Sequence, residues 1–138
     1  MKKIRRSDIP ILAVAAAILV AAAVFLTSVV LDKLEQHLQP CGFGQWIRPK
    51  GGYFVSLNTM PGTAKRALAL CKEAGVEMTP AGATYPYGID PQDSNIRIAP
   101  SLPPVEELQK AMDVFCTCLK LAALEKYLGI TLEQVTEV

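Results

Sequence analysis

An uncharged apolar run near the N-terminus places the strongest constraint on how this chain can fold. Residues 9–31 hold no charged side chain, and Thr27 and Ser28 are the only polar ones. As a helix that rises about 1.5 Å per residue, the run would extend roughly 34 Å, enough to cross a hydrocarbon core of about 30 Å. We therefore expect residues 9–31 to form a transmembrane anchor or signal-like helix that crosses the membrane once.

The charges of residues 1–8 set the expected topology. This flank carries a net charge of +3, from Lys2, Lys3, Arg5, Arg6 and Asp8. Positively charged flanks stay on the cytoplasmic side, so we expect a cytoplasmic N-terminus and a body on the far side of the membrane. The localisation becomes cytoplasmic if the leader is a start-site or fusion artefact.

Two other interpretations of the apolar run stay open. Small residues at 21–23 would suit a cleaved signal peptide, but the run continues beyond them without a polar break, which favours an uncleaved anchor. A buried core helix is the weaker third interpretation, because the segment is apolar on every face.

The rest of the chain excludes several classes of function. The whole chain carries a charge of +1, so residues 9–138 carry −2 and hold no basic stripe for a nucleic-acid partner. The four cysteines lack metal-ligand spacing and the only histidine is His37, which excludes a zinc or Cys/His catalytic site. We expect no metal, and we expect the cysteines to be reduced and mostly buried.

Periodicity after the run predicts a small α+β domain with a short antiparallel or mixed sheet and helices on one face. Val29–Leu38 is amphipathic, Thr63 is a candidate N-cap, and Gly75 is a candidate helix stop. The expected helices and strands, besides the leader, are 29–38, 45–47, 53–57, 63–74, 76–79, 95–99 and 104–128. The predicted organisation is a basic flank 1–8, an anchor 9–31, a domain 32–129 and a tail 130–138.

Arg97 is the candidate binding residue. In a strand, Ile96 and Ile98 point to one face and Arg97 to the other. An arginine held between two buried aliphatic residues presents a fixed guanidinium fork, which suits a carboxylate. On strand position alone, a structural or solvent-facing arginine remains the simpler interpretation.

Four motifs, in order, change that interpretation. They are Pro49–Phe54 (PKGGYF), Ala74–Tyr85 with its TPAGATY loop, Asn95–Ser101 (NIRIAPS) and the closing helix from Pro104. Over about residues 29–128 the chain resembles the C-terminal small domain of fold-type-I, pyridoxal-phosphate-dependent class I/II aminotransferases, in the bacterial aspartate aminotransferase branch. The resemblance implies that Arg97 binds the α-carboxylate of an amino-acid or 2-oxo-acid substrate, with Gly52 and Tyr85 near the substrate entrance.

The departures from the family predict a truncated enzyme. Family members bind pyridoxal phosphate through a Schiff-base lysine in a preceding large domain, and no part of this sequence resembles that domain. We therefore expect no catalytic or cofactor-binding residue here, and no cofactor bound by this chain alone. A separate large domain or a homodimer partner would complete the site. The alternative is a membrane-anchored binding module that reuses the small domain.

Overall fold

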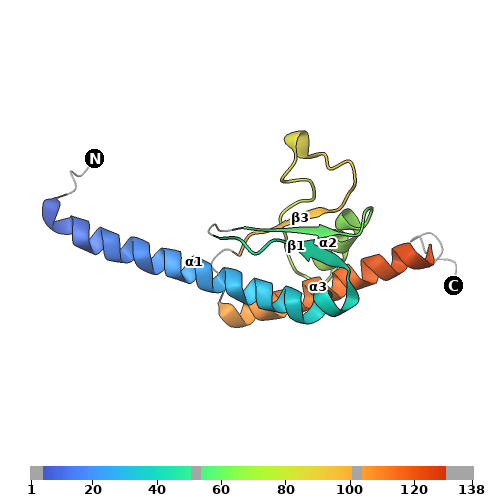
Figure 1. Cartoon of the computed structure of the whole chain (residues 1–138), viewed down its shortest axis with the longest axis horizontal. Helices are drawn as coiled ribbons and strands as arrows, with labels where there is room; N and C mark the ends of the chain where they lie inside the picture. Colours follow the sequence, from blue (N-terminus) through green and yellow to red (C-terminus); the bar gives the residue numbers. More distant parts are fainter. Residues whose placement is uncertain (1–4, 51–53, 101–103, 130–138) are drawn as a thin grey trace.

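An antiparallel sheet and a layer of helices make up the described part of the computed structural model, residues 5–50, 54–100 and 104–129 (Figure 1). Within these residues the sheet order is β1-β2-β3. The strands are β1 (Gly44–Trp46), β2 (Val55–Thr59) and β3 (Asn95–Ile98), and the helices are α1 (Ile9–Leu38), α2 (Ala64–Glu73) and α3 (Val105–Leu128). Short 3-10 turns occur at Arg6–Asp8, Gln39–Cys41 and Pro86–Gly88. The expected α+β class is confirmed.

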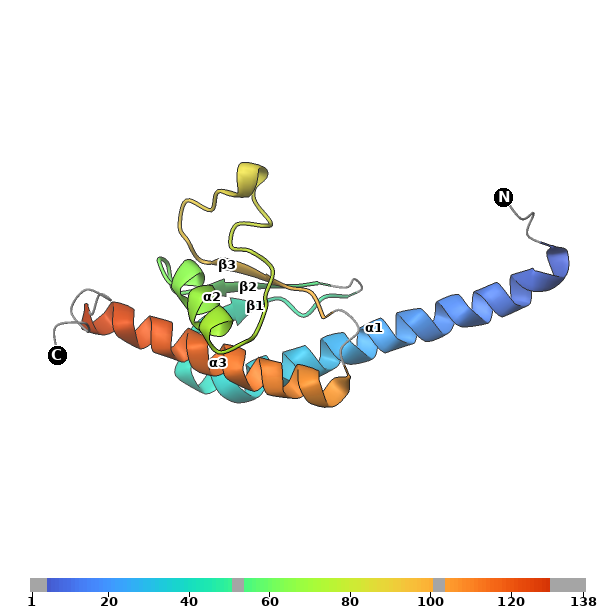
Figure 2. The same ribbon diagram turned by 180° about the vertical axis from the view of Figure 1, so that it is seen from behind.

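The helices cover one face of the sheet. Figures 1 and 2 show α1 and α3 side by side beneath it, while the long loop between α2 and β3 rises on the other side. Alternation along β2 turns Val55 and Leu57 toward the helices and leaves Ser56 and Asn58 exposed. We call the side that carries Ser56 and Asn58 the open face.

The core lies between the two layers. Ile96 and Ile98 of β3 are 1% and 3% exposed, which confirms the predicted alternation on that strand. The helices contribute fully or almost fully buried side chains: Val30, Leu34 and Leu38 from α1, Ala67 and Cys71 from α2, and Met112, Phe115 and Leu119 from α3. The predicted last helix thus packs through Met112, Phe115 and Leu119, which share one face at helical spacing.

The two parts of α1 differ in how far their apolar side chains are buried. Its N-terminal part, Ile9–Phe25, exposes its large apolar side chains, with Ile11 69% and Leu19 63% accessible. From Leu26 onward the helix enters the core, where Leu31 is 3% exposed. The helix is continuous between the two parts, so the packed domain begins inside the apolar run, before residue 32.

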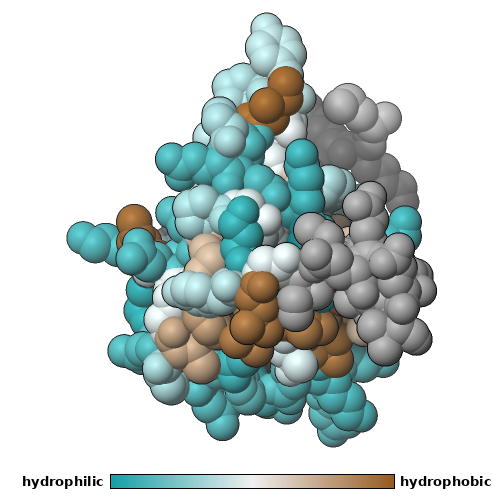
Figure 3. All heavy atoms as spheres, turned by 90° about the vertical axis from the view of Figure 1, so that its right-hand side faces the viewer, coloured by the Kyte–Doolittle hydropathy of each residue, from teal (hydrophilic) through white to brown (hydrophobic). Residues whose placement is uncertain are grey.

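The opposite end of the molecule has a different surface. Figure 3 looks at the end of α3 and shows apolar groups scattered among mainly hydrophilic ones. The exposed apolar side chains near this end of α3 include Leu121, Leu124 and Tyr127. In the N-terminal part of α1, by contrast, exposed large apolar side chains recur from Ile9 to Phe25.

One predicted strand is wrong. The sequence predicts a strand at 76–79, but this segment has no strand pairing in the structure. Its backbone leaves α2 through Gly75, which has φ +83° and ends the helix as expected. A strand needs a neighbour to complete its hydrogen bonds, and none of the described segments pairs with this one.

Thr63 occupies the expected N-cap position of α2, but its side chain makes no capping hydrogen bond. The Thr63 hydroxyl donates to the Met60 carbonyl over 2.6 Å instead of capping α2. Asp93, from the loop before β3, takes that role: its carbonyl accepts from the Ala64 N–H and its carboxylate from the Lys65 N–H, each over 3.0 Å. This contact ties the start of α2 to the segment that leads into β3.

The cysteines are mostly buried, as expected. Cys71, Cys116 and Cys118 are buried and Cys41 is exposed, and all four are free thiols. Burial raises the pKa of Cys71 and that of Cys116 to about 12. These two thiols are therefore protonated at neutral pH, which excludes nucleophilic chemistry at them.

Ion pairs join the helices. Asp113 of α3 accepts from Lys33 Nζ over 2.7 Å and lies 3.0 Å from His37 Nε2, both on α1. His37 is thus a partly buried contact between the two helices. Arg66 of α2 binds Glu125 of α3 through two hydrogen bonds of 2.7 and 3.0 Å.

These pairs predict an acid-sensitive fold. The hydrogen bond from Lys33 lowers the pKa of Asp113, and that from Arg66 lowers the pKa of Glu125. A lowered folded-state pKa stabilises the fold above the unfolded value, about 4, and this stabilisation is lost as the pH falls through the folded value. Urea denaturation between pH 3 and 7 should show the free energy of unfolding falling on the acid side.

A matched variant checks the cause. Asp113→Asn cannot titrate, so its free energy of unfolding should depend less on pH between 3 and 5 than that of the parent chain. Equal pH dependence in the two proteins would contradict a contribution from Asp113.

Candidate functional site

The open face of the sheet carries a polar cluster at its centre. Arg97 and Asn95 of β3 pair in register with Ser56 and Asn58 of β2, so these four side chains lie together on this face. The alternation that buries Ile96 and Ile98 places them there. The sheet therefore presents Arg97 away from the helices, as the sequence predicts.

The guanidinium of Arg97 contacts an aromatic ring, and one of its N–H groups lacks a hydrogen-bond partner among the described residues. Its guanidinium carbon lies 4.8 Å from the centroid of the Phe54 ring, a cation–π contact. Its Nε is buried and has no hydrogen-bond partner among the described residues. A buried donor without a partner is costly, so this atom is poised to bind an acceptor. A carboxylate that reaches Arg97 would satisfy it and pair with the positive charge.

Asn95 organises the rest of the cluster. Its amide nitrogen donates to Ser56 Oγ over 2.9 Å and to Asn58 Oδ1 over 2.7 Å. Its amide oxygen accepts from Thr84 Oγ1 over 2.5 Å. The side chain thus connects both strands to the long loop. Sequence reasoning missed this role, although Asn95 begins the motif that contains Arg97.

Asp90 fixes the approach of the chain to β3. Its carboxylate accepts from the backbone N–H groups of Gln92, Ser94 and Asn95 over 3.0, 2.8 and 2.8 Å. The bonds from Asn95 and Ser94 lower its pKa, so Asp90 stays ionised at neutral pH. The clustered turn residues of 90–94 were the available sequence signal for this role.

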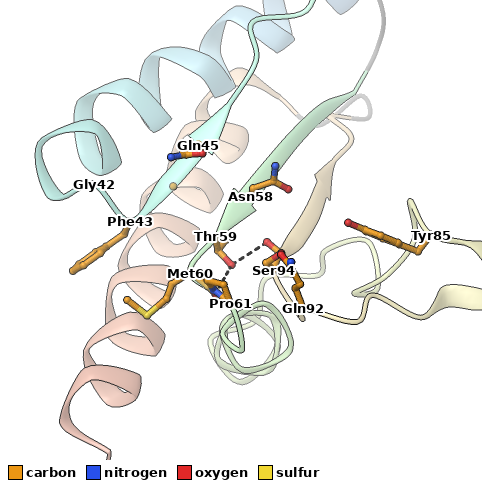
Figure 4. Close-up of a pocket in the computed structure, with 11 residues that line it drawn as sticks. Gly42, Phe43, Gln45, Asn58, Thr59, Met60, Pro61, Tyr85, Gln92 and Ser94 are labelled. Atoms are coloured by element: carbon orange, nitrogen blue, oxygen red, sulfur yellow. Dashed lines mark hydrogen bonds between the residues drawn. The ribbon is translucent and has the colours of Figure 1, made fainter.

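Tyr85 lies away from Arg97. It lines a hollow of about 470 Å³ at the end of the sheet near Asn58, Thr59 and Ser94, and Arg97 is not among the lining residues. Figure 4 shows the Tyr85 ring coming from the long loop, while Asn58 and Thr59 come from β2. The structure therefore does not join Tyr85 to Arg97 in one cavity. Gly52, the third predicted site residue, lies outside the described residues.

Asn95→Ala should weaken the fold. The change leaves the hydrogen-bonding groups of Asn58 and Thr84 without this partner and removes a side chain that is 7% exposed. We expect the free energy of unfolding to fall by about 1–3 kcal/mol, measured by chemical denaturation. Asn58→Ala, at an exposed position of the same cluster, is the control and should cost less. An Asn95→Ala protein as stable as the parent would show that the network carries no stability.

Comparison with known proteins gives the family. The family model described as aspartate amino-transferase matches residues 17–131. An aspartate aminotransferase of Corynebacterium glutamicum is 54% identical over 98 residues, which are 71% of this chain and 23% of that protein.

Solved structures of aminotransferases also resemble this chain. The crystal structure of an aspartate transaminase from Corynebacterium glutamicum aligns with a TM-score of 0.74 and 51% identity, over 78% of this chain and 26% of that one. The α-aminoadipate aminotransferase LysN of Thermus thermophilus, solved with N-(5'-phosphopyridoxyl)-L-leucine, shares the fold with a TM-score of 0.61 and 19% identity, over 72% of this chain and 25% of that one. The chain thus spans about a quarter of the length of these relatives. It belongs to the aspartate aminotransferase family.

Proposed function

We propose that this chain provides the carboxylate-binding part of a pyridoxal-phosphate-dependent aminotransferase. In this proposal Arg97 binds the carboxylate of an amino-acid or 2-oxo-acid substrate. The observation that carries it is the buried Nε of Arg97, which has no partner among the described residues and lies on the face that no helix covers. Family membership supports the same role.

In this proposal the residues that hold the cofactor lie on another polypeptide. Pyridoxal phosphate supplies the electron sink of transamination and is held through a lysine. The described strands contain no lysine, and Lys33 on the helical layer is bound to Asp113. These residues do not fit a covalent cofactor site. We therefore propose that this chain, as a fragment of the enzyme, contributes Arg97 while a separate large-domain polypeptide contributes the lysine.

Co-expression tests the proposal. The partner is the Corynebacterium glutamicum relative from which the region matched by this chain has been deleted. We expect the two polypeptides together to transfer amino groups, and each alone to be inactive. Two polypeptides that copurify with bound pyridoxal phosphate, yet show no activity toward any amino acid tried, would contradict the proposed function.

We also propose that α1 anchors the domain in a membrane. The observation in favour is the exposed apolar part Ile9–Phe25, which is about 26 Å long as a helix and follows the basic residues Arg5 and Arg6. Hydropathy and length allow α1 to span a bilayer, although a single apolar helix near an N-terminus is a weak indication. In this arrangement the domain follows the membrane span without a linker, because α1 is continuous.

Fractionation with protease protection tests the anchor and its topology. The chain should sediment with membranes, resist carbonate extraction and expose its domain on the side opposite the N-terminus. A chain recovered in the soluble fraction would contradict the anchor without affecting the role of Arg97.

A further inference from the structure

Two large apolar side chains are exposed at one end of the sheet. Ile47, which directly follows β1, is 85% exposed, and Phe54, which directly precedes β2, is 52% exposed. Each lies two positions from an exposed residue of its strand, Gln45 or Ser56, so alternation puts both side chains on the open face. We call Ile47 and Phe54 the apolar pair.

The start of α3 marks the level at which α1 leaves the domain. Figures 1 and 2 show both helices running in the same direction, and Asp113 of α3 bonds Lys33 of α1 over 2.7 Å. Val105 lies eight positions before Asp113, and Phe25 lies eight positions before Lys33. The first turn of α3 is therefore roughly level with Phe25, where the exposed part of α1 ends.

The apolar pair lies at the same end of the domain. β3 ends at Ile98, seven positions before α3 begins, and Ile98 pairs with Val55, the neighbour of Phe54. The strand connection thus brings Phe54 to the end of the domain at which α3 starts and α1 leaves. The exposed apolar surface of α1 therefore continues into the open face of the sheet.

Arg48 holds the other member of the pair against α1. It directly follows Ile47 and donates to Glu35 of α1 over 2.8 Å. Lys50, two positions further on, is exposed. A lysine suits a membrane surface, because its ammonium group reaches lipid phosphates while its alkyl chain lies along apolar groups. This side of the domain therefore combines apolar side chains with a basic group, as lipid-binding surfaces do.

The start of α3 lies at the same end of the domain but has the opposite charge. Its first turn carries the exposed acidic residues Glu106 and Glu107. Carboxylates are repelled by anionic lipid headgroups and are costly to bring into an apolar phase. A bilayer crossed by α1 would therefore meet the domain on the side of the apolar pair and not on the side of α3.

We propose that the apolar pair rests in the surface of the bilayer that α1 spans, with both side chains among the upper acyl chains. This inference rests on the proposed anchor, because it takes its partner, a phospholipid bilayer, from it. The continuous α1 keeps the pair beside the bilayer, and this high effective concentration allows a contact of only two side chains to persist. β2 runs away from the bilayer after Phe54, so the rest of the open face stays clear of lipid.

Isoleucine methyl NMR of the full chain in nanodiscs of phosphatidylcholine and phosphatidylglycerol tests this contact. Nuclear Overhauser effects between acyl-chain and methyl protons arise only between groups in direct contact. The native chain supplies the controls: Ile18 is 63% exposed on α1, Ile89 is 67% exposed on the long loop, and Ile98 is 3% exposed in the core. We expect acyl-chain contacts at Ile18 and Ile47, and none at Ile89 or Ile98.

The outcomes separate this contact from the anchor. Contacts at Ile18 without contacts at Ile47 would overturn the proposal and leave the anchor standing. Absence of contacts at Ile18 would refute the anchor, and the proposal with it. Equal contacts at Ile47 and Ile89 would mean unspecific adsorption and would also overturn the proposal. None of these results depends on the role of Arg97, which is measured by the kinetics of the complex.

Matched variants test Ile47 itself. Ile47→Glu and Ile89→Glu each place a carboxylate at an exposed isoleucine position, so both should keep the denaturation midpoint of the parent. We expect Ile47→Glu to lower the acyl-chain contacts of the Phe54 ring at least threefold, and Ile89→Glu to leave them unchanged. Equal intensities in the two variants would overturn the proposal. If Ile47→Glu unfolds, the measurement on the native chain decides alone.

Discussion

Replacing Arg97 by alanine should weaken carboxylate binding by about 2–5 kcal/mol in the complex of this chain with a large-domain polypeptide, because the partner carboxylate is left desolvated and unpaired. That change corresponds to a loss of roughly 30- to 4,000-fold in kcat/KM. The measurement is steady-state transamination, with kcat and KM determined separately.

Two further variants make this result specific. Arg97→Lys keeps the charge but not the planar fork, so it should recover only part of the lost kcat/KM. Arg48→Ala removes an exposed arginine that pairs with Glu35 over 2.8 Å, and it should leave kcat/KM unchanged. If Arg97→Ala and Arg48→Ala have equal kinetics, Arg97 does not bind the substrate.

Leu31→Ala should destabilise the domain by about 2–5 kcal/mol. Leu31 lies inside the apolar run, yet it is 3% exposed and belongs to the core with Leu34 and Leu38. Truncating a buried leucine removes its apolar contacts and leaves a cavity. The measurement is denaturant-induced unfolding of the full chain in detergent, followed by tryptophan fluorescence of Trp46, the only tryptophan.

Leu19→Ala is the matched control on the same helix. Leu19 is 63% exposed, so its truncation should change the free energy of unfolding of the domain by less than about 0.5 kcal/mol. Equal effects of the two substitutions would contradict a domain boundary near Leu26. The pair therefore separates the part of α1 that folds with the domain from the part that does not.

Local patterns predict much of this fold. Alternation around Arg97 gives both the strand and the face on which the arginine lies, since Ile96 and Ile98 both need burial. The stripe through Leu108 and Phe115 likewise gives α3 and its buried side. These features can be read from the sequence because one periodicity determines both the element and its orientation.

Contacts between distant segments limit the prediction. Val76–Thr79 alternates as a strand does, but pairing depends on a neighbour that the pattern cannot reveal. The N-terminus of α2 is bound by Asp93, a residue 28 positions beyond Lys65, and Asn95 bonds Asn58, a residue 37 positions before it. The position at which α1 changes from exposed to buried could not be predicted for a different reason. The segment is apolar on every face, so its sequence does not show where burial begins.

The role of Arg97 is tested most directly at its own Nε. In the complex with the large-domain polypeptide, the Nε–H resonance of Arg97 is followed by ¹⁵N NMR while succinate, a dicarboxylate without an amino or oxo group, is added. A saturable shift at Arg97, absent from the Nε–H of Arg48, is the expected result, because the unpartnered donor gains an acceptor. An Arg97 resonance that stays unchanged while succinate inhibits transamination would show that the substrate carboxylate binds elsewhere.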